Sequence, residues 1–82
     1  MHKRTLGSTN MKISEIGLGC ASYWGKKIFS ETQAIKVVHT ALDKGINFLD
    51  TGHSYSEGNA EYRLGRALQT VINKNDLCIS TK

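Results

Sequence analysis

Asp50, Tyr55 and Lys82 form a set that could transfer a proton, and each follows an apolar run that is typical of a buried strand. Parallel strands end at one edge of a sheet, so we expect these side chains to share a rim. A phenol has a pKa of about 10, and a nearby ammonium makes it a better acid. A carboxylate can hold that ammonium in place. The trio could therefore give a proton to a carbonyl oxygen, while the hydride for the carbon must come from a bound cofactor.

Alternating apolar patterns predict the elements that would position these residues. A hairpin over residues 3–14 is closed by a cluster of turn-forming residues at 7–10. Beyond it, apolar periodicity predicts strands and helices in alternation: strands at 15–20, 46–50 and 77–81, and helices at 31–44 and 60–72. This order predicts an α/β fold with a parallel sheet, right-handed crossovers and both helices on one face.

Local signals mark the helix boundaries. Ser30 and Gln33 form a capping box at the start of the first predicted helix, and Gly45 stands where that helix should stop. Asn59 is the predicted N-cap of the second helix. Arg63 and Arg66 lie within the second helix, and we expect both on its solvated face.

The composition is that of an ordinary globular chain. Its 82 residues carry 11 Lys and Arg against 7 Asp and Glu, and the net charge of +4 is spread along the sequence. This pattern argues against nucleic acid as a partner. The apolar runs are too short to span a membrane, and no secretory signal is visible. Cys20 and Cys78 lie in apolar segments and are expected to be buried thiols, which fits a cytoplasmic protein.

Several motifs resemble the N-terminal part of the aldo-keto reductases. The most specific is Gly-Ile-Asn-Phe-Leu-Asp-Thr at residues 45–51, followed by Tyr55 and by Glu-x-x-Leu-Gly at residues 61–65. Shorter matches extend the resemblance over the chain: Arg4-Thr5-Leu6-Gly7, Ile16-Gly17-Leu18-Gly19 and Ile79-Ser80-Thr81-Lys82. The resemblance implies an oxidoreductase that reduces a small aldehyde or ketone to an alcohol. It also implies a TIM (β/α)₈ barrel whose bottom is closed by the hairpin of residues 3–14.

The resemblance assigns catalytic roles to matching positions. Tyr55 would be the proton donor, Lys82 would make its phenol a better acid, and Asp50 would pair with Lys82 near the cofactor ribose. Trp24 would form part of the substrate pocket wall. His53 is assigned no role.

The cofactor implied by the resemblance is NADPH, with NADH as the alternative. The backbone of Gly19, Cys20 and Ala21 would line the nicotinamide side of its cleft. Gly17 and Gly19 by themselves do not make a dinucleotide-binding fingerprint, because the third glycine of that motif does not follow. Asp50 would complete this side of the cofactor site.

A complete barrel of this kind takes about 250 residues. Residues 1–82 are therefore expected to be an incomplete, truncated part of one barrel domain, an N-terminal β-hairpin plus a (βα)₂β unit. A further catalytic His and the segments that hold the cofactor phosphates would lie later in the chain, so we expect these residues alone to be inactive. One sheet face would stay open, which predicts an oligomer or one part of a longer chain. That face should include Leu18, Phe48 or Leu49, and Cys78 or Ile79.

The sequence offers two alternatives to this hypothesis, a non-catalytic function and a metal site. A non-catalytic regulatory or binding chain on the same fold is the alternative function, and turnover of an aromatic aldehyde would separate it from an enzyme. A metal site at Asp50, His53 and Glu57 is disfavoured, because all of these residues lie on one loop and no second cluster supplies ligands.

Overall fold

The structure is a computed structural model that describes residues 1–52, 54–71 and 76–81. Within these residues the elements follow one another as β1 (Lys3–Thr5), β2 (Lys12–Ser14), β3 (Leu18–Gly19), η1 (Ser22–Gly25), α1 (Glu31–Asp43), β4 (Phe48–Thr51), η2 (Tyr55–Gly58), α2 (Asn59–Leu68) and β5 (Cys78–Thr81). The elements labelled η are single 3₁₀ turns. No helix in this described part of the chain is long and apolar enough to cross a membrane.

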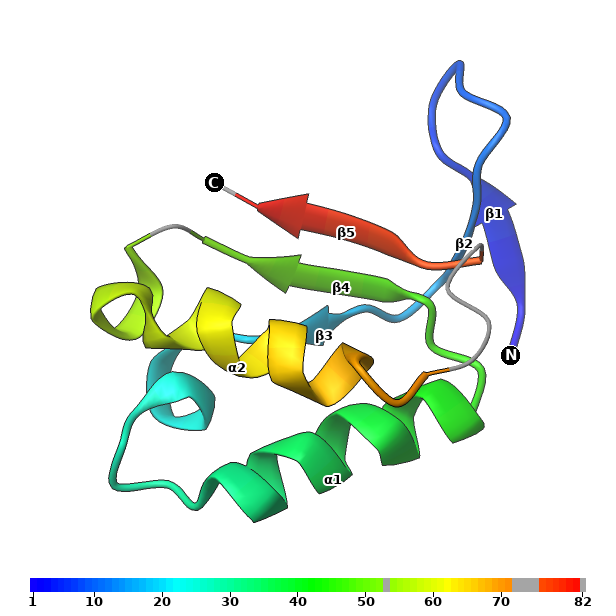
Figure 1. Cartoon of the computed structure of the whole chain (residues 1–82). Coiled ribbons are helices and arrows are strands. Elements are labelled where there is room, and N and C mark those ends of the chain that lie inside the picture. Colours follow the sequence, from blue (N-terminus) through cyan, green and yellow to red (C-terminus); the bar gives the residue numbers. More distant parts are fainter. Residues whose placement is uncertain (53, 72–75, 82) are drawn as a thin grey trace.

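Strands β3, β4 and β5 form a parallel sheet with β4 in the centre. Both helices lie on one face of the sheet, and the antiparallel hairpin of β1 and β2 stands at the end where β4 and β5 begin (Figure 1). The parallel pairing agrees with the predicted alternation, because a strand–helix–strand unit brings the chain back in the same direction.

The first strand is much shorter than its apolar run. Residues 15–20 were expected to be extended, but only Leu18–Gly19 pairs with β4. Ser14 turns the chain just before this strand, since its hydroxyl donates to the Ile16 carbonyl at 2.6 Å. Ile16 is consequently 60% exposed, although its sequence context predicts burial.

Helix α1 begins and ends where the sequence predicts. The Ser30 hydroxyl accepts the Gln33 N–H at 3.4 Å, which caps the first turn. Gly45 has a φ of +95°, the left-handed conformation that closes a helix. The N–H of Ile46 still donates back into α1, and the next strand therefore starts at Phe48.

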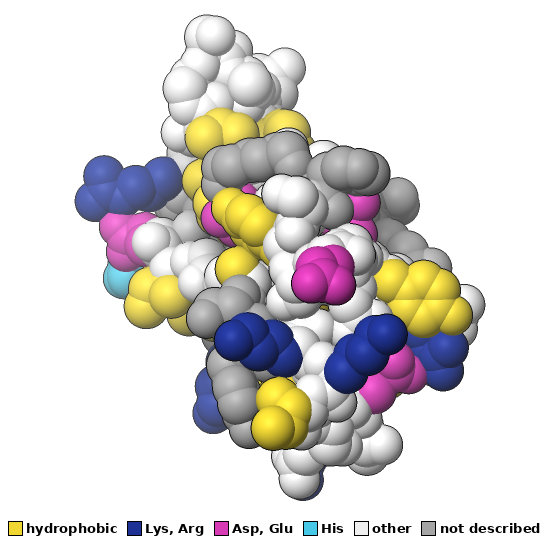
Figure 2. Space-filling view, turned by 90° about the vertical axis from the view of Figure 1, so that its left-hand side faces the viewer, with side chains coloured by type: hydrophobic (Ala, Val, Ile, Leu, Met, Phe, Trp, Pro, Cys, Tyr) yellow, Lys and Arg dark blue, Asp and Glu magenta, His cyan; other side chains and the backbone are white. Residues whose placement is uncertain are grey.

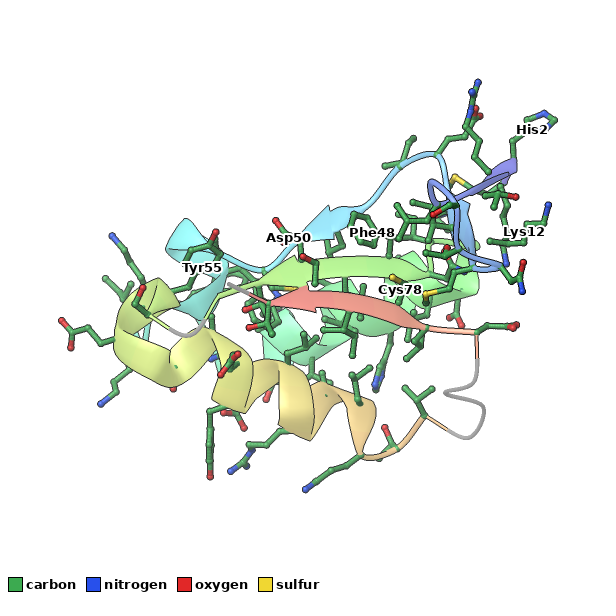
Figure 3. The ribbon with its side chains drawn as sticks, turned by 90° about the horizontal axis from the view of Figure 1, so that it is seen from above. His2, Lys12, Phe48, Asp50, Tyr55 and Cys78 are labelled. Carbon is green, nitrogen blue, oxygen red and sulfur yellow. The ribbon has the colours of Figure 1, made fainter. Side chains whose placement is uncertain are left out.

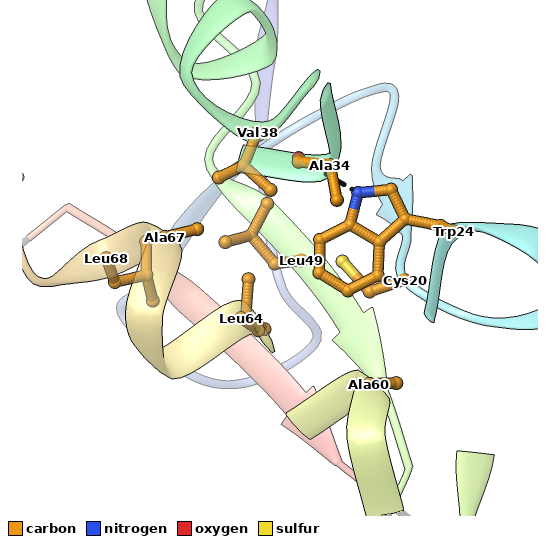
Figure 4. Close-up of a cluster of buried hydrophobic side chains, with 9 residues drawn as sticks. All are labelled: Cys20, Trp24, Ala34, Val38, Leu49, Ala60, Leu64, Ala67 and Leu68. Atoms are coloured by element: carbon orange, nitrogen blue, oxygen red, sulfur yellow. Dashed lines mark hydrogen bonds between the residues drawn. The ribbon is translucent and has the colours of Figure 1, made fainter. Parts of the chain in front are cut away.

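The core lies between α1, α2 and the sheet face that they cover (Figure 4). Alanines allow the two helices to approach each other and the sheet, and larger side chains fill the space between them. The buried cluster consists of Cys20, Trp24, Ala34, Val38, Leu49, Ala60, Leu64, Ala67 and Leu68. Leu49 is fully buried at its centre, which fixes the side of β4 that faces the helices.

A buried asparagine attaches the hairpin to the sheet. Asn47, just before β4, accepts the Ser14 N–H at 2.7 Å with its side-chain oxygen. Its side-chain nitrogen donates to the carbonyls of Lys12 and Asp76, both at 2.9 Å. One amide thus joins β2, β4 and the entry to β5. The hairpin lies at the N-terminal end of the strands, as expected.

Candidate active site

Asp50 lies at the C-terminal end of β4, on the sheet face opposite the helices. Side chains alternate along a strand, so Phe48 and Asp50 point away from the face of the buried Leu49. Their register partners in β5, Cys78 (Figure 3) and Ser80, share that face. Asp50 is half-buried there. The end of the molecule to which β4 and β5 run carries acidic and basic side chains interspersed with apolar ones (Figure 2).

The pairing corrects one part of the expected open face. Phe48 and Cys78 belong to it, as the sequence allowed. Leu18, in contrast, pairs with Leu49 and packs against the core beneath the helices. Ile79 also pairs with Leu49 and lies on the helix side, although it is 47% exposed at the sheet edge.

Tyr55 follows β4 through a tight turn, in which its N–H donates to the Gly52 carbonyl at 3.2 Å. Its ring lies directly over Gly52, where a β-carbon would come within 2.8 Å of a ring carbon. Only glycine permits this approach. Tyr55 is half-buried against the core cluster, at the same end of the sheet as Asp50 (Figure 3).

The turn after Tyr55 is left-handed. Ser56 has a φ of 51° and Glu57 a φ of 59°, conformations that L-residues adopt rarely, and Gly58 follows with a φ of 93°. Gly58 is the N-cap of α2, so the prediction of Asn59 as the cap is wrong. The Asn59 side chain instead donates to the Gly25 carbonyl at 2.6 Å. Strained backbone of this kind is typical of functional sites.

The residues expected to line a cofactor come close to Asp50. Gly19 is its register partner in β3, and the Cys20 N–H donates to the Asp50 carbonyl at 2.7 Å. Apart from Gly19 and its two chain neighbours, no described residue has an atom within 4 Å of the position that a β-carbon on Gly19 would take, so space is left beside Asp50. Ala21 follows at the start of the loop and is half-buried.

Cys20 is fully buried. Burial, and secondarily the negative charge of Asp50, raise the pKa of its thiol to about 11. The thiol therefore stays protonated at neutral pH and is not a nucleophile. The prediction that Cys20 and Cys78 are buried free thiols is confirmed.

Lys82, the third member of the predicted trio, lies outside the described residues, and so does His53. Strand β5 stays paired with β4 as far as Thr81, which lies opposite Thr51. The structure thus describes Asp50 and Tyr55 at one end of the sheet, and the pairing of Lys82 with Asp50 stays a prediction.

Arg63 is the residue whose placement the sequence most clearly failed to predict. It was expected on the solvated face of α2, but it is only 4% exposed. Its Nη1 donates to the Trp24 carbonyl at 2.7 Å and its Nη2 to the Phe29 carbonyl at 2.5 Å. A signal was present, since Arg63 lies three residues after the buried Ala60 and four before the buried Ala67, within the apolar stripe.

Two further expectations about side chains have different outcomes. Arg66 is exposed and its Nε forms an ion pair with Glu31 at 2.8 Å, so its placement on the solvated face is confirmed. Trp24 was expected in a pocket wall but packs inside the core, where its indole N–H donates to the Ala34 carbonyl at 3.0 Å (Figure 4).

Comparison with known proteins identifies relatives over the full chain. An uncharacterized oxidoreductase of Bacillus subtilis is 38% identical over 82 residues, which are 100% of this chain and 25% of the relative. The versiconal hemiacetal acetate reductase of Aspergillus parasiticus is 32% identical over 87 aligned residues, again 100% of this chain and 25% of the relative. The chain thus spans a quarter of the length of these curated relatives.

The fold also superposes on solved structures along almost the whole chain. The holo form of an aldo-keto reductase from Bacillus halodurans superposes with a TM-score of 0.82 at 34% identity, covering 99% of this chain and 25% of that one. The fold is therefore α/β and matches aldo-keto reductase structures along this stretch. The model of the aldo/keto reductase family matches residues 15–82. With most of its length matched in this way, the chain belongs to the aldo/keto reductase family.

Proposed function

We propose that the protein carrying this chain is an oxidoreductase that reduces an aldehyde or ketone to an alcohol with NADPH, or with NADH as the alternative. The observation that carries the proposal is that Asp50 lies beside Gly19 on the uncovered sheet face, that the Cys20 N–H donates to the Asp50 carbonyl, and that Tyr55 is held over Gly52 at the same end. Family membership and relatives with reductase names support the same reaction class.

The residues beside Asp50 fit a nicotinamide cofactor. The missing side chain of Gly19 leaves room for a flat ring or a sugar against the sheet. The Asp50 carboxylate can accept hydrogen bonds from sugar hydroxyls. Ala21 carries the lining out of the sheet into the following loop. When bound, the cofactor would supply the hydride that no side chain can provide.

The chain's own residues would handle the proton. Tyr55 would donate its phenolic proton to the carbonyl oxygen of the substrate as negative charge develops there. Gly52 holds the ring of Tyr55 in one place, because the ring rests on its backbone. Asp50 would orient the ammonium of Lys82 beside the phenol, and a hydrogen-bonded, charged neighbour is what makes a phenol an effective acid at neutral pH.

Residues 1–82 would form the first part of a single (β/α)₈ barrel domain, namely its bottom hairpin and a (βα)₂β unit. Among the described strands, β3 and β5 each pair on one side only, and the face bearing Phe48 is not covered by a helix. Open edges and an apolar face call for further strands. By themselves these residues would be inactive and would associate with other chains, and sedimentation of the 82-residue chain tests the second point.

The proposal predicts that Tyr55→Phe strongly slows reduction. In the full-length gene product, NADPH-dependent reduction of an aromatic aldehyde should fall by about a hundredfold or more, because the proton donor is lost. Tyr62→Phe is the matched control, since Tyr62 is 61% exposed on α2 and its hydroxyl contacts Arg66. Equal rates in wild type and Tyr55→Phe would contradict the assignment. No turnover by the wild-type protein with a panel of aldehydes and ketones would favour the non-catalytic alternative.

A further inference from the structure

Two side chains of helix α2 form hydrogen bonds with the backbone of the loop between β3 and α1. Asn59 donates to the carbonyl of Gly25, and Arg63, one turn later on the same face, donates to the carbonyls of Trp24 and Phe29. Successive parts of the loop therefore have their carbonyls bound by one helix. The contact is close, because a β-carbon on Gly25 would lie 3.0 Å from the β-carbon of Ala60.

Two of these hydrogen bonds come from the buried, charged side chain of Arg63. Arg63 is 4% exposed, none of the described carboxylates forms an ion pair with it, and its Nε has no hydrogen-bond partner among the described residues. Burying a guanidinium costs free energy that carbonyl dipoles offset only in part. An apolar side chain would avoid that cost but would leave the carbonyls of Trp24 and Phe29 without these donors. The arginine at this position is therefore explained by the two loop carbonyls that it holds.

The loop between β3 and α1 and the start of helix α2, which these hydrogen bonds join, carry the two halves of the proposed site. The loop begins with Cys20 and Ala21, which are proposed to line the cofactor. The helix begins directly after η2, which carries Tyr55 and whose Ser56 side chain packs against Gly25. Any shift of the loop relative to α2 would change the distance between the cofactor-lining backbone and the proton donor.

We propose that Arg63, assisted by Asn59, is a positioning residue that fixes the cofactor-lining loop relative to Tyr55. This inference rests on the proposed function. The guanidinium suits the task because its planar fork of donors reaches two carbonyls five residues apart in the chain, Trp24 and Phe29. A lysine has its three donors on one nitrogen at the end of a flexible stem, so it cannot present two separate nitrogens in a fixed geometry to these carbonyls.

The test compares Arg63→Ala and Arg63→Lys with Arg66→Ala in the full-length gene product. Arg66 is the matched control, because it lies on the same helix but pairs at the surface with Glu31. In the cofactor-free protein, the rate of hydrogen exchange at the backbone amides of residues 24–29 should rise in both Arg63 variants and stay unchanged in Arg66→Ala. The dissociation constant for NADPH, measured on folded protein below the melting temperature, should rise about tenfold in Arg63→Ala, with a smaller rise in Arg63→Lys.

Chemical rescue separates positioning from a general loss of stability. Millimolar guanidinium, compared with the same concentration of sodium chloride, should restore NADPH binding to Arg63→Ala and should not change Arg66→Ala. If Arg63→Ala does not fold, Asn59→Ala provides the test, with the same direction of change and a smaller size. Wild-type NADPH affinity and loop exchange in the folded Arg63 variants would overturn the inference while leaving the proposed function intact. Absence of NADPH and NADH binding by the wild-type protein would instead overturn the proposed function.

Discussion

The two ends of the sheet are held together in different ways. At the N-terminal end, Asn47 is 5% exposed, its side-chain oxygen accepts a hydrogen bond, and its side-chain nitrogen donates two. At the C-terminal end, two buried polar atoms have no partner among the described residues, the Thr51 Oγ1 and the Arg63 Nε. Left-handed backbone at Ser56 and Glu57 belongs to the C-terminal end as well.

This difference indicates that the N-terminal ends of the strands mainly stabilise the fold and that the C-terminal ends mainly carry function. Fully bonded polar groups lower the free energy of the folded state, whereas unpartnered polar atoms and strained backbone raise it. Barrels of parallel strands are typically stabilised at the N-terminal face and carry their chemistry at the C-terminal face. A substitution at the N-terminal end should accordingly cause a large loss of stability. Substitutions at the C-terminal end should instead reduce activity or change stability only slightly, and the following experiments test that expectation.

The largest effect on stability is expected for Asn47→Ala. The substitution leaves the Ser14 N–H and the carbonyls of Lys12 and Asp76 without their partner, and the free energy of unfolding should fall by about 3 kcal/mol. Urea denaturation of the full-length protein measures it. Asn10→Ala, at the exposed turn of the hairpin, is the control. An Asn47 variant that loses activity per folded molecule without losing stability would break the comparison.

Gly52→Ala should act on activity instead. A methyl group at this position would lie 2.8 Å from the ring of Tyr55 and would push the phenol out of place. Misplacing a reacting group in this way should reduce kcat for aldehyde reduction about tenfold or more. Gly65→Ala lies in α2, where the new β-carbon would have no described atom within 4 Å beyond its chain neighbours and the adjacent helix backbone, so this variant should keep full activity and add up to about 1 kcal/mol of stability. Equal kcat in these two variants would refute the proposed role of Gly52.

Cys20, near the C-terminal end of the sheet, should make the stability of the protein fall at alkaline pH. Its pKa is raised from 9.0 to about 11 by burial, so the thiol form is favoured in the folded state. The resulting stabilisation is complete below pH 9 and is lost as the pH rises through 11. The urea midpoint of the wild type should therefore fall more steeply over this window than that of Cys20→Ala. Parallel pH profiles for the two proteins would show that Cys20 titrates equally in both states.

The smallest effect is expected for Thr51→Val. The substitution replaces an unpartnered buried hydroxyl with a methyl group of the same shape, so stability should stay the same or rise by up to about 1 kcal/mol. Its register partner Thr81 provides the matched control, because that hydroxyl donates to the Glu61 carboxylate and Thr81→Val should destabilise. A clear loss of stability in Thr51→Val would mean that its hydroxyl has a role at this end of the sheet.

The order of the elements followed from the sequence because apolar periodicity is a local property. Ser30 and Gly45 set the limits of α1 by contacts within one turn, and these limits could be read from residue types. Asp50 and Tyr55 were located through a motif whose spacing is specific. Their position at one end of a parallel sheet followed from the strand order.

The remaining features depend on contacts between distant segments. The place of Arg63 in the apolar stripe of α2 indicates burial, but its partners are carbonyls 39 and 34 residues earlier in the chain, and no local pattern indicates that the loop returns there. Asn59 has the residue type of a cap, but Gly25 lies within reach of its side chain and Gly58 can adopt the left-handed conformation that starts the helix. Trp24 could not be placed for the same reason, since its partner is a carbonyl of α1.

Asn47 also constrains the order in which the chain can complete its fold during synthesis. Its hydrogen bond with Ser14 joins residues 33 positions apart that are both available early, whereas its hydrogen bond with Asp76 has to wait for 29 further residues. A nascent chain folds from its N-terminus, so the hairpin can meet the start of β4 before β5 exists. The last donor of this amide stays hydrated until residue 76 has emerged. A ribosome paused before that point would therefore carry a hairpin that is only partly attached, and release of the pause would complete the attachment at the moment β5 begins to pair.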